Sequence, residues 1–144
     1  MRRATFLVGL LACLAGCAPP GEPVADPNSD AQGKRFEPPS QGMAALYVVR
    51  GNDLPGTPPI AVSVGSRQLG TLASNTWLRI EVAPGTYDVR ATGSDGAGSH
   101  YVSVWPQEIR FLDVTYAGRS QRGVVSELSP EQGRQVVLSG RRVR

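Results

Sequence analysis

The sequence of 144 residues predicts an all-β fold, an antiparallel β-sandwich of about seven to eight strands with at most one short helical turn. From Met43 onward, short runs rich in β-branched residues are separated by glycine and proline, with a turn signal roughly every 8–12 residues. The 17 glycines and 12 prolines disfavour a helical bundle. The hydrophobic content of 40% is enough for one modest core.

Hydrophobic periodicity predicts the first strands. Residues 44–50 are apolar on both faces, which predicts a central strand. The following loop contains Pro55-Gly56 and a second proline pair, which no helix could cross. Residues 60–64 and 76–82 alternate apolar and polar side chains, so each is expected to bury one face. In the later strand this alternation places Leu78, Ile80 and Val82 inward and Trp77 outward.

Turn and cap signals divide the rest of the domain. Pro84-Gly85 predicts a type II turn, because proline presets its φ and glycine accepts a positive φ. The glycine-rich residues 93–99 predict a mobile connection. The apolar pattern changes frame between Phe111 and Leu112, which predicts a β-bulge in a strand over 108–116. Ser129-Pro130-Glu131-Gln132 is an N-cap with proline at the first helical position, which predicts a single helical turn. The other expected strands are 68–72, 86–92, 100–105, 124–128 and 135–138, the last before a basic tail at 141–144.

Residues 1–16 have the organisation of a secretory signal peptide, with Arg2 and Arg3 before an apolar run. The twelve residues of that run cover about 18 Å as a helix, too short for a hydrocarbon core of about 30 Å. The run ends in Leu14-Ala15-Gly16-Cys17, which resembles the lipobox of bacterial lipoproteins. A branched apolar residue and two small residues precede the cysteine that receives the lipid.

The lipobox resemblance implies cleavage between Gly16 and Cys17, a diacylglyceryl thioether on the Cys17 sulfur and an acyl chain on its new amino group. Two or three acyl chains attach a protein durably to a membrane, and no other cofactor is expected. Ala18 follows the lipidated residue, where an aspartate would retain an enteric lipoprotein in the inner membrane. The resemblance therefore implies an outer-membrane lipoprotein of a Gram-negative cell envelope, with its domain facing the periplasm.

Processing would change the charge and the cysteine count. The chain has 15 Lys and Arg against 12 Asp and Glu, and the loss of Arg2 and Arg3 leaves 13 against 12. A net charge of +1 gives no reason to expect a nucleic-acid partner. Cys13 leaves with the signal and Cys17 carries lipid, so no disulfide is expected in the mature domain.

Residues 17–42 are predicted to be a lipidated cysteine followed by a disordered, proline-rich tether. Residues 18–42 hold six of the twelve prolines and almost no bulky apolar side chain. Such a composition cannot bury enough surface to offset the entropy of ordering. The predicted organisation is a signal peptide at 1–16, the tether at 17–42 and the sandwich with its basic tail at 43–144.

The domain resembles a family of uncharacterised bacterial lipoprotein domains over roughly residues 36–138. Residues 41–50 (QGMAALYVVR) match an aliphatic-Tyr-Val-x-Arg strand, and Leu69-Gly70 and residues 82–87 (VAPGTY) follow in the family's order. Met43 departs from the family, which more often has lysine there. The Pro-Gly-x-Tyr hairpin is shared with transthyretin-like and carboxypeptidase-regulatory-like modules, so the resemblance implies a transthyretin-like (prealbumin-like) sandwich. The family has no established activity.

No residues are predicted to be catalytic or to bind a metal. His100 is the sole histidine, and no free thiol is expected after processing, which excludes a Cys–His pair and a thiolate zinc site. A triad of Ser99 or Ser103 with His100 and Asp95 is disfavoured, because neighbouring strand residues point to opposite faces and no nucleophile elbow occurs. Asp95 alone is a poor start for a calcium loop. The protein is therefore not expected to be an enzyme.

Two surface features suggest partners. If Trp77, Tyr101 and Trp105 converge, they form an aromatic patch for a glycan or an envelope protein; the alternative is that they cover the open end of the sandwich. The tail at 141–144, with Arg119 and Arg122, either meets anionic lipopolysaccharide or lipid headgroups or is a solvated terminus.

These observations predict a non-enzymatic, lipid-anchored binding or accessory module of the cell envelope. The alternative is a structural subunit of an envelope machine, since type VI secretion also uses a small transthyretin-like outer-membrane lipoprotein.

Overall fold

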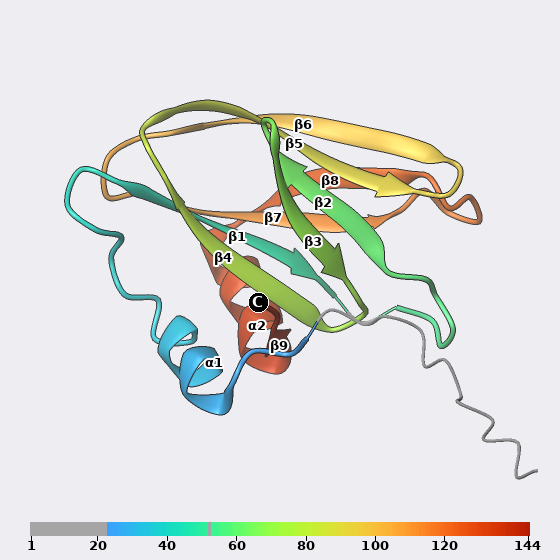
Figure 1. The fold of residues 1–144 in the computed structure, drawn as a ribbon, viewed down its shortest axis with the longest axis horizontal. Helices are drawn as coiled ribbons and strands as arrows, with labels where there is room; N and C mark the ends of the chain where they lie inside the picture. Colours follow the sequence, from blue (N-terminus) through green and yellow to red (C-terminus); the bar gives the residue numbers. More distant parts are fainter. Residues whose placement is uncertain (1–22, 52) are drawn as a thin grey trace, which may run out of the picture.

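The computed structural model describes residues 23–51 and 53–144, and in this part the chain forms two β-sheets and two helices. One sheet has the strand order β8-β7-β1-β4-β9 and the other β3-β2-β5-β6. The sheets stack face to face, and both helices lie on the outer side of the five-stranded sheet (Figure 1). The strands are β1 (Ala44–Arg50), β2 (Ile60–Val64), β3 (Arg67–Leu72), β4 (Thr76–Val82), β5 (Gly85–Gly93), β6 (Gly96–Val104), β7 (Ile109–Tyr116), β8 (Gly123–Leu128) and β9 (Arg141–Arg142), and the helices are α1 (Pro27–Gly33) and α2 (Pro130–Ser139).

The prediction of a β-rich, sandwich-like domain is confirmed, with two differences. Nine strands are present in the described residues, and the five-stranded sheet is mixed, because β1 runs parallel to β7 and β4 runs parallel to β9. Two helices replace the single turn that was expected. The predicted signal peptide at 1–16 and the lipobox residues Gly16 and Cys17 lie outside the described residues. No described helix is long and apolar enough to span a bilayer.

The prediction that the first strand is central is confirmed. All seven residues of β1 are buried, and the strand lies between β7 and β4. Leu46 and Val48 point into the core between the two sheets, whereas Tyr47 and Val49 belong to a second cluster beneath the helices. The five-stranded sheet therefore buries both of its faces.

The predicted bulge between Phe111 and Leu112 is absent. Each of these residues of β7 pairs with β1 in a continuous register. Both are buried because they point to opposite faces, Phe111 toward the helices and Leu112 into the inter-sheet core. A register shift occurs instead between Val62 and Ser63, where β2 pairs with β3.

The segment predicted as a mobile connection, residues 93–99, is part of a hairpin. Gly93 pairs with Gly96, and β6 starts at Gly96. The glycines allow the backbones of the two sheets to approach each other: a Cβ on Gly98 would lie 2.3 Å from the carbonyl oxygen of Gly123, and one on Gly93 would lie 2.0 Å from that of Gln121. The glycine content here reflects close packing as well as turn formation.

The strand predicted at 135–138 is wrong, because these residues belong to helix α2. The helix starts with a full capping box between Ser129 and Gln132. Its Gly133 lies directly on Phe111, where a Cβ would be 2.1 Å from the ring. Val137 is fully buried in the same cluster. This packing outweighs the β preference of the neighbouring valines.

The disordered tether predicted for residues 18–42 is wrong for residues 23–42, which we call the N-terminal strap. Its helix α1 is capped by Asp26, and its Phe36 ring lies 5.6 Å from the ring of Tyr47. Its start pairs with the end of the described chain through a bridge between Val24 and Val143. Val143 is buried, so the predicted solvated terminus is also wrong. The strap folds because Ala25 and Pro39 are buried and Phe36 packs on the aromatic side chains of the sheet.

Candidate functional site

The predicted aromatic patch of Trp77, Tyr101 and Trp105 is not formed. Tyr101 and Trp105 are 70% and 68% exposed, but Trp77 is fully buried. Trp77 does point away from the face of Leu78, as predicted, but that outward face is covered by α1 and α2. Trp105 lines a shallow hollow of about 290 Å³ beside the Pro84 turn.

Trp77 belongs instead to an aromatic cluster beneath the strap, made of Phe36, Tyr47, Trp77 and Phe111. Neighbouring rings in this cluster lie 5.1–6.0 Å apart between centroids. Burial raises the pKa of Tyr47, whose hydroxyl donates a hydrogen bond to the carbonyl of Gly33 at 2.8 Å. The cluster fastens the strap to the sheet.

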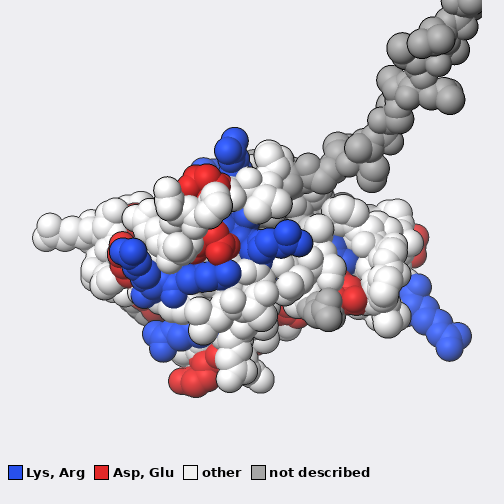
Figure 2. Space-filling model, turned by 90° about the horizontal axis from the view of Figure 1, so that it is seen from below, with Lys and Arg blue, Asp and Glu red and all other residues white. Residues whose placement is uncertain are grey.

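Arginine side chains cover this aromatic cluster. The guanidinium of Arg142 lies 5.7 Å from the centre of the Trp77 ring, that of Arg79 lies 5.8 Å from Tyr47, and that of Arg134 lies 5.6 Å from Phe36. On the face that carries α1, α2 and β9, basic side chains extend along the middle with acidic ones among them (Figure 2). The cation–π contacts hold Arg79 and Arg142 in fixed positions at the surface.

Four arginines line a surface hollow of about 310 Å³, which we call the arginine hollow. Two of them are held by neighbours: Arg79 pairs with Glu81 at 3.0 Å, and Arg142 donates to the carbonyl of Ser29 at 3.0 Å. Among the described residues, the exposed guanidinium groups of Arg67 and Arg144 have no ion-pair or hydrogen-bond partner. The hollow is lined by residues of the strap, β3, β4 and the C-terminal segment, namely Ala25, Asp26, Ser29, Arg67, Gln68, Leu69, Leu78, Arg79, Ile80, Arg142, Val143 and Arg144.

The acidic groups near the arginine hollow already have partners, and Glu81 is paired with Arg79 of the hollow itself. Hydrogen bonds from Ser29 hold the pKa of Asp26 below its ordinary value, and its carboxylate caps α1. A hydrogen bond from Ser40 lowers the pKa of Glu81. Asp26 has the one acidic side chain that lines the hollow with the four arginines, so the side chains of its wall carry a net charge of +3 from four cations and one anion. This arrangement favours an anionic ligand.

The sequence indicated only part of the arginine hollow. It offered Arg142 and Arg144 as a basic tail that either meets anionic lipid or is solvated, whereas Arg67 and Arg79 carry no local signal that links them to the tail. Arg119 and Arg122, which were grouped with the tail, lie in the connection between β7 and β8 and do not line the hollow.

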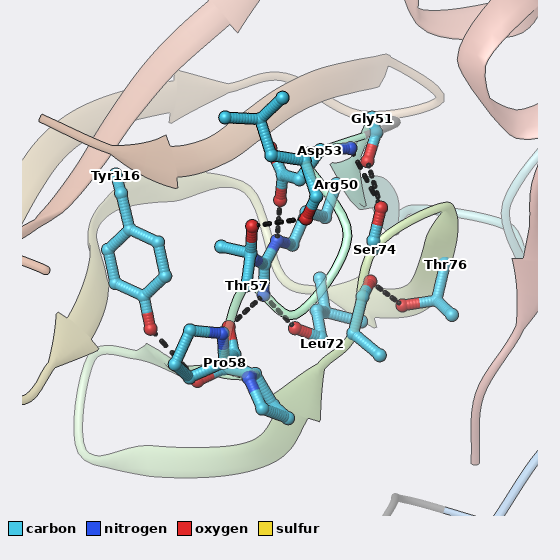
Figure 3. Close-up of polar contacts among 12 residues, drawn as sticks. Arg50, Gly51, Asp53, Thr57, Pro58, Leu72, Ser74, Thr76 and Tyr116 are labelled. Carbon is cyan, nitrogen blue, oxygen red and sulfur yellow. Dashed lines mark hydrogen bonds and ion pairs between the residues drawn. The ribbon is translucent and has the colours of Figure 1, made fainter. Parts of the chain in front are cut away.

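A second charged site is buried at the end of β1 (Figure 3). Arg50 is fully buried, and its Nε donates to the carboxylate of Asp53. Its Nη1 donates to the carbonyl oxygens of Pro58 and Leu72, each at 2.7 Å. Its guanidinium also lies 5.3 Å from the centre of the Tyr116 ring. Arg50 thus ties the described residues of the 51–59 loop to the ends of β1 and β3.

The carboxyl group of Asp113 lies near this network. Burial raises its pKa, and the charge of Asp53 adds to that effect, whereas a hydrogen bond from the Gly51 backbone and the charge of Arg50 oppose it. The folded protein therefore keeps Asp113 protonated to a higher pH than the unfolded chain does, and stability falls as pH rises through the interval between the two pKa values.

We expect Asp113→Asn to increase the free energy of unfolding at pH 7, because asparagine removes the buried charge and still accepts the hydrogen bond from Gly51. Below the ordinary pKa of 3.8 both side chains are neutral, so the gain should disappear. Urea unfolding of the two proteins at pH 7 and at acidic pH measures the difference. A gain that is equal at both pH values would contradict the assignment of the effect to charge.

The residues weighed for a triad are not brought together. The Nε2 of His100 lies 3.8 Å from the carboxylate of Glu127, not near Asp95. The Asp95 carboxylate accepts from the Gln121 backbone at 2.8 Å, which joins the β5–β6 turn to the β7–β8 connection. The hydroxyl of Ser103 shares a hydrogen bond of 2.8 Å with Thr86. In the described part of the chain, no three His, Cys, Asp or Glu side chains are grouped so that they could hold a metal ion.

Neither models of known protein families nor curated protein sequences match this chain.

Proposed function

We propose that this protein is a non-enzymatic outer-membrane lipoprotein, a binding or accessory module of the envelope of a Gram-negative cell that is anchored by lipid on Cys17. The lipobox at residues 14–17 supports the anchor, as does the position at which the fold begins. The first described residue, Pro23, is already joined to the domain, because its carbonyl accepts a hydrogen bond from the Arg144 backbone at 3.3 Å.

The short distance between Cys17 and Pro23 is the observation that carries the proposal. Only residues 18–22 separate them, and a fully extended chain of this length reaches at most about 20 Å. A free tether of 25 residues would span about 28 Å as a coil and about 75 Å as a polyproline helix. The domain is therefore held against the membrane surface instead of standing away from it.

The finer fold assignment, a transthyretin-like sandwich of the uncharacterised lipoprotein-domain type, forms part of the proposal. One contact supports it, since the Tyr87 hydroxyl donates to the carbonyl of Ala83 at 2.7 Å. This hydrogen bond is a structural reason for the tyrosine of the Pro-Gly-x-Tyr pattern. The predicted type II turn and hairpin at Pro84-Gly85 are absent, because Gly85 has a φ of 155° instead of about 80° and joins β4 and β5, which lie in different sheets.

The alternative, a structural subunit of an envelope or secretion machine, is favoured by one feature. Tyr101 and Trp105 expose large aromatic side chains on or just after β6, which lies at the edge of its sheet. Exposed aromatic residues of this kind fit a protein or glycan partner. Crosslinking in cells followed by mass spectrometry tests it, and an apparatus protein lost after Trp105→Ala would support this alternative.

We expect Cys17→Ser to abolish acylation and processing, because the lipid is attached through the thioether of this cysteine. Labelled palmitate and membrane fractionation on a density gradient measure both effects. Cys13→Ser is the matched control, since it removes a cysteine only four residues away and should leave the protein acylated in the outer membrane. Acylation and processing that survive Cys17→Ser would refute the anchor.

A further inference from the structure

We propose that the arginine hollow is the surface through which the domain binds the anionic phosphate headgroups of the membrane that holds its lipid anchor. This inference rests on the proposed function, because the anchor sets which face of the domain meets the membrane.

The hollow lies where the chain enters the fold. Ala25 and Asp26 form part of its wall, and Arg144 lies beside Pro23 through the backbone hydrogen bond between them. The Ala25 backbone also donates to the carbonyl of Arg142 at 3.0 Å. Lipid on Cys17 would be at most about 20 Å from this rim. The membrane is therefore within reach of the hollow whenever the anchor is inserted.

The charge of the hollow matches a phosphate surface. Guanidinium groups bind phosphate through two parallel hydrogen bonds, and four of them line the hollow with one acidic side chain, Asp26, while Arg79 is also paired with Glu81. Arg67 and Arg144 are exposed and have no partner among the described residues, so they can bind a headgroup without first breaking an ion pair.

Part of the hollow is preorganised. Arg142 is fixed by the carbonyl of Ser29 and the ring of Trp77, and Arg79 is fixed by Glu81 and the ring of Tyr47. Groups that are already ordered lose less entropy on binding. The strap therefore completes the hollow and, through the carbonyl of Ser29, holds one of its cations in place.

A membrane headgroup fits better than a soluble phosphate compound. The hollow is open to the surface, and its cations come from segments that border a broad face instead of enclosing a small cavity. Each contact is weak singly, at about a fivefold gain in affinity per arginine near an anionic surface. The anchor compensates for this weakness, because it converts binding into an intramolecular step with a high effective concentration.

Vesicle binding tests the inference without the lipid. The polypeptide of residues 17–144 with Cys17→Ser keeps every described contact, since all of them lie within residues 23–144. It is mixed with vesicles of phosphatidylcholine alone or with phosphatidylglycerol added, at low and at high ionic strength. We expect binding to the anionic vesicles that is lost at high ionic strength.

Two double variants identify the surface. Arg67→Gln with Arg144→Gln should weaken binding to anionic vesicles about 25-fold, at about fivefold per arginine. Arg119→Gln with Arg122→Gln makes the same change in net charge in the β7–β8 connection and should leave the affinity within about twofold. Circular dichroism of both variants confirms that they remain folded.

Three results would overturn the inference: equal weakening by both double variants, equal binding to neutral vesicles, or displacement by inorganic phosphate at a concentration equal to that of the lipid phosphate. The last would assign the hollow to a soluble phosphate compound. The vesicle assay uses a chain without lipid, so a negative result would not contradict acylation at Cys17. Likewise, a chain that proves not to be acylated at Cys17 would not change the measured binding to anionic vesicles.

Discussion

Replacing Arg50 with methionine is expected to lower the free energy of unfolding by about 3–5 kcal/mol. Methionine fills much of the same space but donates no hydrogen bond. The carboxylate of Asp53 and the carbonyls of Pro58 and Leu72 would lose the hydrogen bonds that Arg50 donates, and all three of these contacts are buried or partly buried. Leaving a charged group and two carbonyls without a hydrogen-bond donor costs more free energy than is gained by burying methionine in place of the charged arginine.

Chemical denaturation measures the effect, and two comparisons sharpen it. Arg67→Met changes an exposed arginine and should alter stability by less than about 0.5 kcal/mol. Arg50→Met combined with Asp53→Asn should recover part of the loss, because it removes the stranded charge. The prediction is contradicted if Arg50→Met lowers the free energy of unfolding by less than about 1 kcal/mol, or if the double variant is no more stable than Arg50→Met. Either result would show that Arg50 does not secure the loop.

The inter-sheet core was predictable from the sequence because it obeys a strict period of two. Leu78, Ile80 and Val82 alternate with polar residues along β4, and all three belong to that core in the structure. The same reasoning placed the continuous apolar run of residues 44–50 in the centre of a sheet. Strand positions of this kind depend on local alternation, which a single sequence contains.

The second buried face could not be predicted in the same way, because it is covered by segments distant in sequence. Glycine is a poor helix former, yet Gly33 and Gly133 each allow a helix to lie on an aromatic ring, Trp77 and Phe111 respectively. Proline-rich composition indicated disorder for the strap, although Phe36 and α1 are enough to dock it. The composition of a segment shows how many apolar side chains it has. It does not show whether the rest of the fold presents a complementary surface on which those side chains can pack.

The arginine hollow likewise could not be predicted from the sequence alone, because its residues come from segments that are far apart in the sequence. The tail supplied Arg142 and Arg144 as a visible basic run, but Arg79 joins them only because β9 runs parallel to β4. Arg67 joins them from the other sheet. A pairing between the end of the chain and an internal strand has no signal in periodicity or charge runs. The lipobox, by contrast, is a contiguous motif, so a single sequence is enough to predict an anchor from it.

Replacing Trp77 with alanine is expected to lower the free energy of unfolding by about 3–5 kcal/mol, because it removes the largest fully buried side chain among the described residues. Trp105→Ala is the matched control: the same atoms are removed from a side chain that is 68% exposed, and the change should stay within about 0.5 kcal/mol. Equal losses for the two variants would contradict the burial of Trp77 beneath the strap.

The same substitution should release the strap before the domain unfolds. Trp77 supports Gly33 of α1 and the guanidinium of Arg142, so its loss removes contacts on both sides of the strap's pairing with the C-terminal segment. Trypsin should then cleave after Lys34 or Arg35 in Trp77→Ala under conditions where Trp105→Ala stays intact, since proteolysis requires local opening. A released strap would lengthen the connection between Cys17 and β1 to the 26 residues 18–43, which reach roughly 28 Å as a coil. If the strap positions the arginine hollow at the membrane, Trp77→Ala must also weaken binding to anionic vesicles, and a variant that is cleaved at the strap yet binds them normally would separate the two roles.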